Sequence, residues 1–310
     1  MWCLDDEDVM ILKDILSIYH KELDDLFGNV EVDSFFNILI EHYLDLKRIH
    51  LVLEPQYVIT KEEKQPLFEA LTHLKLQKPI QYILGETEFY GLPFKVNEYT
   101  LIPRPETEEL VALIIVNSKD KSPKTNATET VTSNGVEKLH KIIDIGTGTG
   151  CIAISLAKHL KNAKVYALDV SEEALIIAKQ NAELNEVDVE FLEQNILTAC
   201  HSALEEESSF DTIVSNPPYV RNLEKAEIQP NVLDNEPHLA LFVDDDNPLR
   251  FYKAICEFAQ INLKANGTLY FEINEYLGEE MIALLEDFNF KAIELKKDVF
   301  GKDRMIKGVK

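Results

Sequence analysis

The sequence predicts an α/β protein in which a mostly parallel sheet carries helices on both faces. A small N-terminal helical domain, joined to the sheet by a β-hairpin, is expected to precede it. Strand-like and helix-like segments alternate from residue 139 to the C-terminus, which indicates repeated βαβ units. Residues 9–76 instead show apolar side chains at helical spacing. Residues 79–105 contain short β-type runs punctuated by Gly and Pro, as in a hairpin.

The composition is that of an ordinary globular protein. The chain has 310 residues, of which 45% are hydrophobic and 28% charged, which suits two domains or one large one. No apolar run reaches the roughly 18 residues that a membrane helix needs. The acidic residues 5–8 are unlike the basic start of a signal peptide. We therefore expect a cytoplasmic protein with no membrane partner.

The net charge of −24 disfavours a nucleic-acid partner, because proteins that grip phosphates usually present a basic face. A basic protein partner fits this charge, and so does an acidic surface that only aids solubility.

The cysteines and histidines predict neither a metal site nor a disulfide framework. The cysteines show no CxxC pair and the histidines no HExxH motif. We therefore expect no metal, and buried free thiols at Cys3, Cys151, Cys200 and Cys256.

The N-terminal helical domain is expected over residues 1–78 and the hairpin linker over residues 79–105. Three sets of apolar residues at helical spacing begin at Val9, Phe35 and Leu67. After the linker, Thr107 is a candidate N-cap of a helix with acids in its first turn.

The second domain is expected over residues 106–310. Residues 117–138, rich in Ser, Thr, Asn and Lys, predict a flexible surface linker. The strands are expected at residues 141–145, 164–170, 189–193, 210–215, 268–273, 291–295 and 305–309. Helices are expected after the first strand to about residue 161, and at residues 171–185, 249–263 and 279–288. Parallel sheets bind ligands at the carboxyl ends of their strands.

A glycine-rich turn, residues 144–150, follows the first strand of this domain and opens a helix. Glycines let the backbone turn tightly and approach a ligand, and helix N-terminal amides then face it. The GxGxG spacing, with an acid two residues earlier, suits S-adenosylmethionine, whereas dinucleotide-binding folds use GxGxxG. A purely structural turn is the competing interpretation. The candidate cofactor-binding residues here are Gly146, Thr147, Gly148, Thr149 and Gly150.

Two further strand ends carry candidate cofactor contacts. Asp169 ends the second strand, where a carboxylate can accept both ribose hydroxyls of a nucleoside; a helix cap or a solvated acid is the alternative. Asn195 and Ile196 follow the third strand, where an amide can bond adenine and an apolar side chain can cover its face. A turn asparagine explains Asn195 equally well.

The turn Asn216-Pro217-Pro218-Tyr219 follows the fourth strand and suits chemistry on a planar NH2 group. The side-chain oxygen of Asn216 can accept one N–H of such a group, and the carbonyl of Pro217 can accept the other. Two prolines stiffen the turn and offer no donors, while Tyr219 can pack on the flat face of the amide. Methyl transfer then needs mostly proximity and orientation, with no strong general base.

The catalytic residues predicted from this turn are Asn216, Pro217 and Tyr219. Pro218 joins them in binding the substrate, and Asn216 also contacts the cofactor. A Pro-Pro turn that merely ends a strand is the competing interpretation.

With these motifs, the chain resembles the protein-(glutamine-N5) methyltransferases of the HemK/PrmC type, which modify the Gly-Gly-Gln glutamine of class I peptide chain release factors. The similarity covers most of the chain. Besides the glycine loop and Asp169, its motifs are PIQYILG (79–85), LIPRPETE (101–108), IVSNPPY (213–219), Glu236-Pro237 and GKDR (301–304).

The resemblance implies a Rossmann-like class I methyltransferase domain with a seven-stranded, mostly parallel sheet. It also implies S-adenosyl-L-methionine as cofactor and a helical N-terminal domain that recognises the substrate. The chain departs from the family at residues 242–247, where glycines are usual. It departs again at Asn274, where Glu-Ile-Gly is frequent and this chain reads Glu-Ile-Asn.

Other functions stay open at this point. Adenine-N6 methyltransferases of nucleic acid share the NPPY turn, although the net charge of −24 disfavours them. Enzymes that methylate a glutamine of a ribosomal protein share it too, but tend to read Pro-Arg-Ser-Pro where residues 103–108 read Pro-Arg-Pro-Glu-Thr-Glu. A non-catalytic cofactor-binding protein is disfavoured by the intact glycine loop, Asp169 and the NPPY turn.

Overall fold

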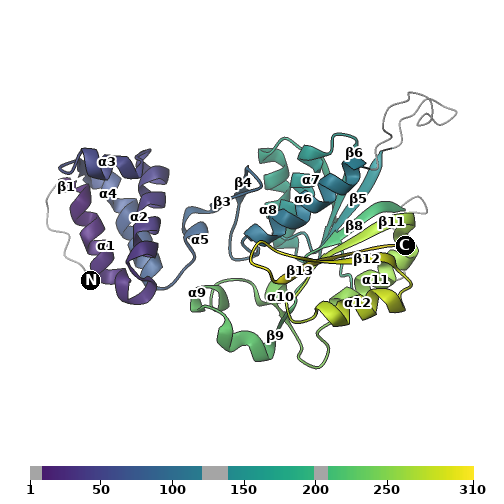
Figure 1. Cartoon of the computed structure of the whole chain (residues 1–310). Coiled ribbons are helices and arrows are strands. Elements are labelled where there is room, and N and C mark those ends of the chain that lie inside the picture. Colours follow the sequence, from purple (N-terminus) through teal and green to yellow (C-terminus); the bar gives the residue numbers. More distant parts are fainter. Residues whose placement is uncertain (1–8, 121–138, 199–208) are drawn as a thin grey trace. The chain divides into compact units, whose positions relative to one another are not determined.

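The computed structural model describes residues 9–120, 139–198 and 209–310 (Figure 1). The chain divides into two compact units. One comprises Met1–Gly85 with Pro230–Asn235, and the other comprises Glu86–Gln229 with Glu236–Lys310. Among the described residues, no helix combines the length and the apolar character needed to span a bilayer.

The first unit is a set of helices with a two-stranded antiparallel sheet. Its core contains Tyr19, Phe36 and Leu67, all fully buried. Residues 9–11 and 58–60, which the sequence analysis placed in a helical region, are strands instead. The elements are β1 (Val9–Ile11), α1 (Leu12–Phe27), α2 (Asn29–Leu44), α3 (Arg48–Leu53), β2 (Val58–Thr60), α4 (Lys61–Lys75), α5 (Ile80–Leu84) and α9 (Pro230–Leu233).

The second unit contains a seven-stranded sheet in the order β12-β13-β11-β8-β5-β6-β7. Only β13 runs antiparallel to its neighbours. The predicted mostly parallel, seven-stranded sheet is therefore confirmed. The strands are β5 (His140–Ile145), β6 (Ala163–Asp169), β7 (Val189–Glu193), β8 (Phe210–Ser215), β11 (Leu263–Glu272), β12 (Lys291–Lys297) and β13 (Asp303–Val309).

Helices cover both faces of this sheet (Figure 1). Because its central strands are buried on two sides, runs such as Ile142 to Ile145 are fully enclosed. Cys151 and Cys256, one in each helical layer, are buried free thiols as predicted, whereas Cys3 and Cys200 lie outside the described residues. One layer contains α6 (Pro105–Asp120), α7 (Cys151–His159) and α8 (Glu172–Leu184), and the other contains α11 (Arg250–Asn262) and α12 (Gly278–Asp287).

The hairpin of β3 (Glu86–Phe89) and β4 (Leu92–Lys95) belongs to the second unit. Tyr90 and Gly91 join its strands, and both have positive φ, as a tight two-residue hairpin turn requires. Asn181 of α8 fixes the hairpin, since its amide accepts from the N–H of Lys95 and donates to the carbonyl of the same residue.

Helix α6 corrects two expectations. It begins at Pro105, a residue suited to the first helical position, so Thr107 lies within the first turn and is not the N-cap. The helix also continues to Asp120, so residues 117–120 are helical and not part of a linker. Residues 121–138 lie outside the described residues.

Short elements connect β8 to α11, a region in which the sequence predicted motifs but no helix or strand. Besides α9 of the first unit, they are β9 (Val220–Arg221), the 3-10 helix η2 (Asn222–Glu227), α10 (His238–Leu241) and β10 (Phe242–Val243). β10 pairs in parallel with β9. The aspartates of the atypical segment 242–247 are exposed; Asp245 accepts the N–H of Leu223, and Asp244 pairs with Arg250.

Candidate functional site

A cavity of about 280 Å³ lies in the second unit, at the carboxyl ends of β5, β6, β7 and β8. This is the edge at which a parallel sheet presents its connecting loops to ligands. The structure brings together residues from all four predicted motifs in the wall of this cavity. Those residues are Gly146, Gly148, Asp169, Asn195, Ile196, Asn216, Pro217 and Pro218.

The glycine loop forms part of the wall with backbone alone. Gly146 and Gly148 have φ values of 75° and 54°, a conformation that favours glycine. A Cβ placed on either residue would meet no atom within 4 Å, so both positions face open space. The N–H groups of Gly146 and Thr147 bond the carbonyl of Leu168, which holds the loop against the end of β6. The loop therefore leaves a cradle in which a ligand can approach the backbone closely.

Gly150 has a different role from the other two glycines. It is the N-terminal cap of α7, with φ of 82°. A Cβ at this position would lie 2.8 Å from Cδ1 of Ile154 and 3.3 Å from Cβ of Ala178. Gly150 is thus required for close packing between the loop, α7 and α8.

The two threonines of the loop are buried and bond protein groups. The hydroxyl of Thr147 donates to Oδ2 of Asp144 at 2.6 Å, and the carbonyl of Thr149 accepts from the amide of Asn181 at 2.9 Å. The hydroxyl of Thr147 and the backbone carbonyl of Thr149 thus stabilise the turn. The assignment of Thr147, Thr149 and Gly150 as cofactor contacts stays a prediction.

Asp144 is fully buried beneath the loop. Its Oδ1 atom has no hydrogen-bond partner among the described residues. Burial raises the pKa of this carboxyl to about 7, although the hydrogen bond from Thr147 opposes the shift. Asp144 therefore supports the loop from below, through its hydrogen bond with Thr147.

Asp169 lies at the end of β6, in the cavity wall. One carboxylate oxygen accepts the N–H of Gly148 at 2.8 Å, and the other accepts the N–H of Ser171 at 3.0 Å. Burial raises the pKa of Asp169, while these N–H groups act against the shift. Each oxygen retains a lone pair, so the side chain remains able to accept the two hydroxyls of a ribose.

Asn195 and Ile196 contribute the opposite end of the wall. The side-chain oxygen of Asn195 accepts the N–H of Leu197 at 3.0 Å, the geometry of an asparagine turn. Asn195 is an exposed residue, whereas Ile196 is buried, with 8% of its surface exposed. Ile196 offers an apolar surface suited to the flat face of a base, and the predicted role of Asn195 stays a prediction.

The first three residues of the NPPY turn, Asn216 to Pro218, line the cavity, whereas Tyr219 does not. Pro217 is buried, and the Nδ2 group of Asn216 donates to Oγ1 of Thr107 at 3.3 Å. Tyr219 donates from its hydroxyl to Oε1 of Glu272 at 3.1 Å. Burial raises the pKa of Tyr219, with the carboxylate of Glu272 adding to the effect, so the phenol keeps its proton.

Glu272 is the main residue of this site that the sequence analysis missed. It ends β11, is 1% exposed, and accepts a 2.6 Å hydrogen bond from Thr107 besides the one from Tyr219. Burial raises its pKa, although both hydrogen bonds oppose the shift. An acid at the end of a buried strand was the signal used for Asp169, and the same signal could have found Glu272.

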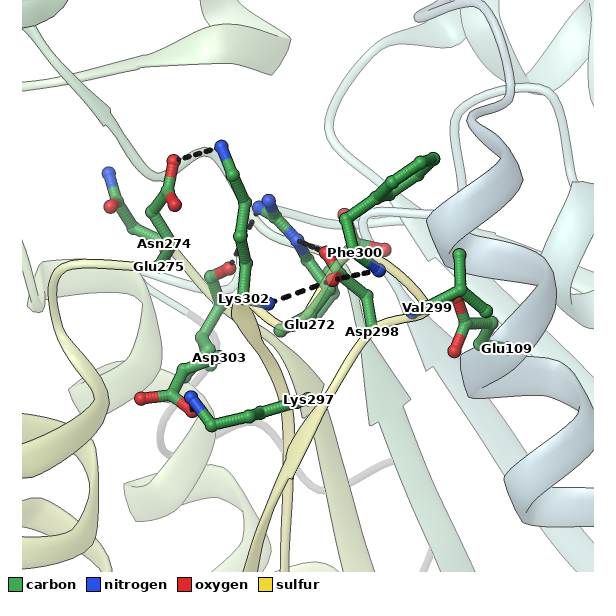
Figure 2. A network of polar contacts seen from close by, with 12 residues as sticks. Glu109, Glu272, Asn274, Glu275, Lys297, Asp298, Val299, Phe300, Lys302 and Asp303 are labelled. Carbon is green, nitrogen blue, oxygen red and sulfur yellow. Dashed lines mark hydrogen bonds and ion pairs between the residues drawn. The ribbon is translucent and has the colours of Figure 1, made fainter.

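The turn between β12 and β13 lies next to Glu272 and is held by its own polar contacts (Figure 2). Asp298 accepts the N–H groups of Phe300 and Lys302, each at 2.9 Å, and Lys302 pairs with Glu275 at 2.8 Å. These contacts involve the GKDR motif and stabilise the turn behind the cavity.

Other missed residues come from the segments around Arg104 and Glu236. Arg104 pairs with Glu236, and the neighbouring residues Leu101 and Pro237 lie in the cavity wall. Both segments belong to motifs of the family that the sequence resembles, and that resemblance was the available signal.

Comparisons with known proteins identify the family. The model of the PrmC N-terminal domain matches residues 27–85, and the model of the methyltransferase small domain matches residues 125–239. The chain is 54% identical to the release factor glutamine methyltransferase of Flavobacterium psychrophilum, over 96% of this chain and 99% of the relative. The release factor glutamine methyltransferase of Bacteroides thetaiotaomicron is 39% identical, over 94% of this chain and 98% of the relative.

These matches confirm the predicted enzyme class and support S-adenosylmethionine as cofactor. The cavity residues fit that cofactor, since the open glycine cradle lets a ligand approach the backbone and the carboxylate of Asp169 can accept the hydroxyls of its ribose. With the helical N-terminal region and the methyltransferase fold both matched along nearly the whole chain, this protein belongs to the release factor glutamine methyltransferase family.

Proposed function

We propose that this protein transfers a methyl group from S-adenosylmethionine to the side-chain amide nitrogen of the Gly-Gly-Gln glutamine in class I peptide chain release factors. The observation that carries the proposal is the shared cavity. Asn216, Pro217 and Pro218 line the same wall as the glycine cradle and Asp169. A target amide and a methyl donor can therefore be held side by side.

The residues of the NPPY turn are suited to orient a carboxamide. An amide nitrogen is a poor nucleophile because its lone pair is delocalised into the carbonyl. The side-chain oxygen of Asn216 and the carbonyl of Pro217 accept its two N–H groups, which leaves the direction perpendicular to the amide plane open. Gly146, Gly148 and Asp169 hold the cofactor. When bound, S-adenosylmethionine supplies an electrophilic methyl group. The proton leaves the amide nitrogen for water after transfer, so positioning is the main contribution of the protein.

In this proposal the helical domain over residues 1–78 recognises the substrate, residues 79–105 link it to the catalytic domain, and residues 106–310 carry out methyl transfer. The match of the PrmC N-terminal domain to residues 27–85 supports a role specific to this family. Because release factors act in translation, this function implies a cytoplasmic protein. Its net charge of −24 favours a protein partner over nucleic acid.

The test is transfer of labelled methyl groups to a purified class I release factor, with the modified peptide read by mass spectrometry. We expect one methyl group on the Gly-Gly-Gln glutamine, none on a release factor whose glutamine is replaced by alanine, and none with Asn216→Ala. Label on duplex DNA, on a large-subunit ribosomal protein, or on another residue of the release factor would overturn the proposal.

A further inference from the structure

The side chain of Asn216 can face the cavity in two ways that differ only by a flip of its amide. With the oxygen toward the substrate, Asn216 accepts an N–H of the target amide. With the NH2 group toward the substrate, two donors meet and binding is repelled. The chain therefore needs a device that selects one orientation, and this requirement rests on the function proposed above.

Thr107 contacts the amide of Asn216 from α6. Its Oγ1 atom lies 3.3 Å from Nδ2 of Asn216 and 2.6 Å from Oε2 of Glu272. A hydroxyl has a single proton to donate. Because Thr107 donates that proton to Glu272, its oxygen can only accept from Asn216. The nitrogen of the Asn216 amide must then face Thr107, and its oxygen is turned away.

Glu272 determines the direction in which the Thr107 hydroxyl donates its proton. Its two carboxylate oxygens accept from Thr107 and from Tyr219, so the group faces two donors and offers none. Tyr252 fixes the same residue by donating to its backbone carbonyl at 3.1 Å. Glu272 and Thr107 are 1% and 3% exposed, so water does not compete for either contact.

We propose that Thr107 and Glu272 are positioning residues for methyl transfer, which lock the Asn216 amide with its oxygen directed toward the substrate. The chain of hydrogen bonds runs from Asn216 to Thr107 to Glu272, across the NPPY turn, the first turn of α6 and the end of β11. Through Tyr219 the same carboxylate also holds the far end of the NPPY turn.

Thr107→Val tests the proposal, because valine has the shape of threonine without the hydroxyl. We expect kcat for release-factor methylation to fall by at least about tenfold, as misplacing a reactive group by a fraction of an ångström does. The Kd for S-adenosylmethionine should stay unchanged in calorimetry. Thr107→Ser keeps the hydroxyl and should restore most of the activity. A kcat for Thr107→Val within about twofold of wild type would overturn the proposal.

Thr212→Val is the matched control. Thr212 is also buried, at 3% exposure, and its hydroxyl bonds His140 at 3.0 Å, away from the cavity. We expect this variant to lose stability without losing kcat. An equal loss of kcat in both variants would show that any buried threonine is needed, and would sink the positioning role.

A second measurement separates this proposal from the function it rests on. In the wild-type protein labelled with 15N-asparagine, one Nδ2 proton of Asn216 should exchange slowly with water, because it is bonded to Thr107. Glu272→Gln, which places a donor in the network, should shift that signal and speed its exchange. Fast exchange in the wild-type protein would overturn the positioning role. If no release factor is methylated but the slow proton is present, the proposed function fails while the locked orientation of the Asn216 amide stands. A slow proton lost in Thr107→Val confirms that Thr107 provides the lock.

Discussion

Arg104 and Glu236, which are 132 residues apart in the chain, form an ion pair with 2.5 Å between Nη2 and Oε1. The second oxygen of Glu236 accepts the N–H of Ile102 at 3.2 Å. The side chain of Glu236 is 1% exposed, while that of Arg104 is 33% exposed. One buried carboxylate therefore joins the segment before α6 to the segment before α10, and both segments contribute to the cavity wall.

Glu236→Ala should lower the free energy of unfolding by about 2 kcal/mol, because the Ile102 N–H loses its partner in a buried place. The ion pair with Arg104 contributes little to this loss of about 2 kcal/mol, because the side chain of Arg104 reaches solvent. Urea denaturation of the full chain measures the change. Glu190→Ala, which removes an exposed ion pair with Lys164, is the control and should cost much less. Equal losses in the two variants would contradict the assignment of Glu236 as a structural link.

The sequence predicted the strands of the second unit as short apolar or alternating runs that alternate regularly with long helical segments. The short elements between β8 and α11 escaped prediction, since they lie outside this alternation and their two to six residues show no clear apolar pattern. The motif residues were predictable because each follows a strand, and parallel strand ends meet at one edge. The contacts of Glu272 were not, because Thr107 and Tyr219 lie 165 and 53 residues away, and only the order of strands in the sheet brings them together.

Asn274, which stands where the family often has glycine, has a structural role in this protein. In the sequence it stands out only as a replacement of the glycine that is frequent in the family. In the structure it is 6% exposed, and its Nδ2 group donates to the carbonyl of Tyr219 and to Glu224, each at 3.1 Å. Asn274→Ala should lower the free energy of unfolding by about 1–3 kcal/mol, because the carbonyl of Tyr219 loses a donor and Glu224 loses one of its donors.

Thermal unfolding followed by circular dichroism measures the effect of Asn274→Ala. Asn274→Gly separates the hydrogen bonds from backbone freedom, since glycine adds conformational entropy to the unfolded chain and should be less stable again. An alanine variant as stable as the wild type would show that the amide of Asn274 contributes nothing.

Two alanine substitutions in the glycine loop should have different effects, one on cofactor affinity and the other on stability. Gly148→Ala places a methyl group in the open cradle, so cofactor affinity should fall by about tenfold or more, with a strain of about 1 kcal/mol from the positive φ. Gly150→Ala drives its methyl group into Ile154, so the main loss should be stability. Calorimetric titration of S-adenosylmethionine and urea denaturation distinguish the two. A Gly148→Ala protein that binds the cofactor normally would contradict the proposed cradle.

Asp144 should make the stability of the cofactor-free protein fall as the pH rises toward neutrality. Burial raises the pKa of its carboxyl from 3.8 to about 7 in the folded protein. Between those two values the folded state binds a proton that the unfolded chain has released, so this group stabilises the fold progressively as the pH falls. Above pH 7 both states are ionised at Asp144, and the cost of burying its charge is present in full.

Asp144→Asn keeps an acceptor for Thr147 and removes the charge, so the variant should be more stable than wild type at pH 8. That advantage should shrink as the pH is lowered toward 5, where the wild-type carboxyl is protonated. Asp211→Asn is the control, for which the change in stability should have the opposite sign. Burial acts to raise the pKa of Asp211, but the hydrogen bonds from Lys264 and from the backbone N–H of Lys141 outweigh it and hold the pKa below its ordinary value. Its ionised form therefore stabilises the fold at neutral pH, and Asp211→Asn should be less stable than wild type at pH 8. Urea denaturation at several pH values checks both variants. An advantage of Asp144→Asn that is independent of pH would contradict a titrating Asp144, because only a proton taken up by the wild-type carboxyl makes the difference between the two proteins change with pH.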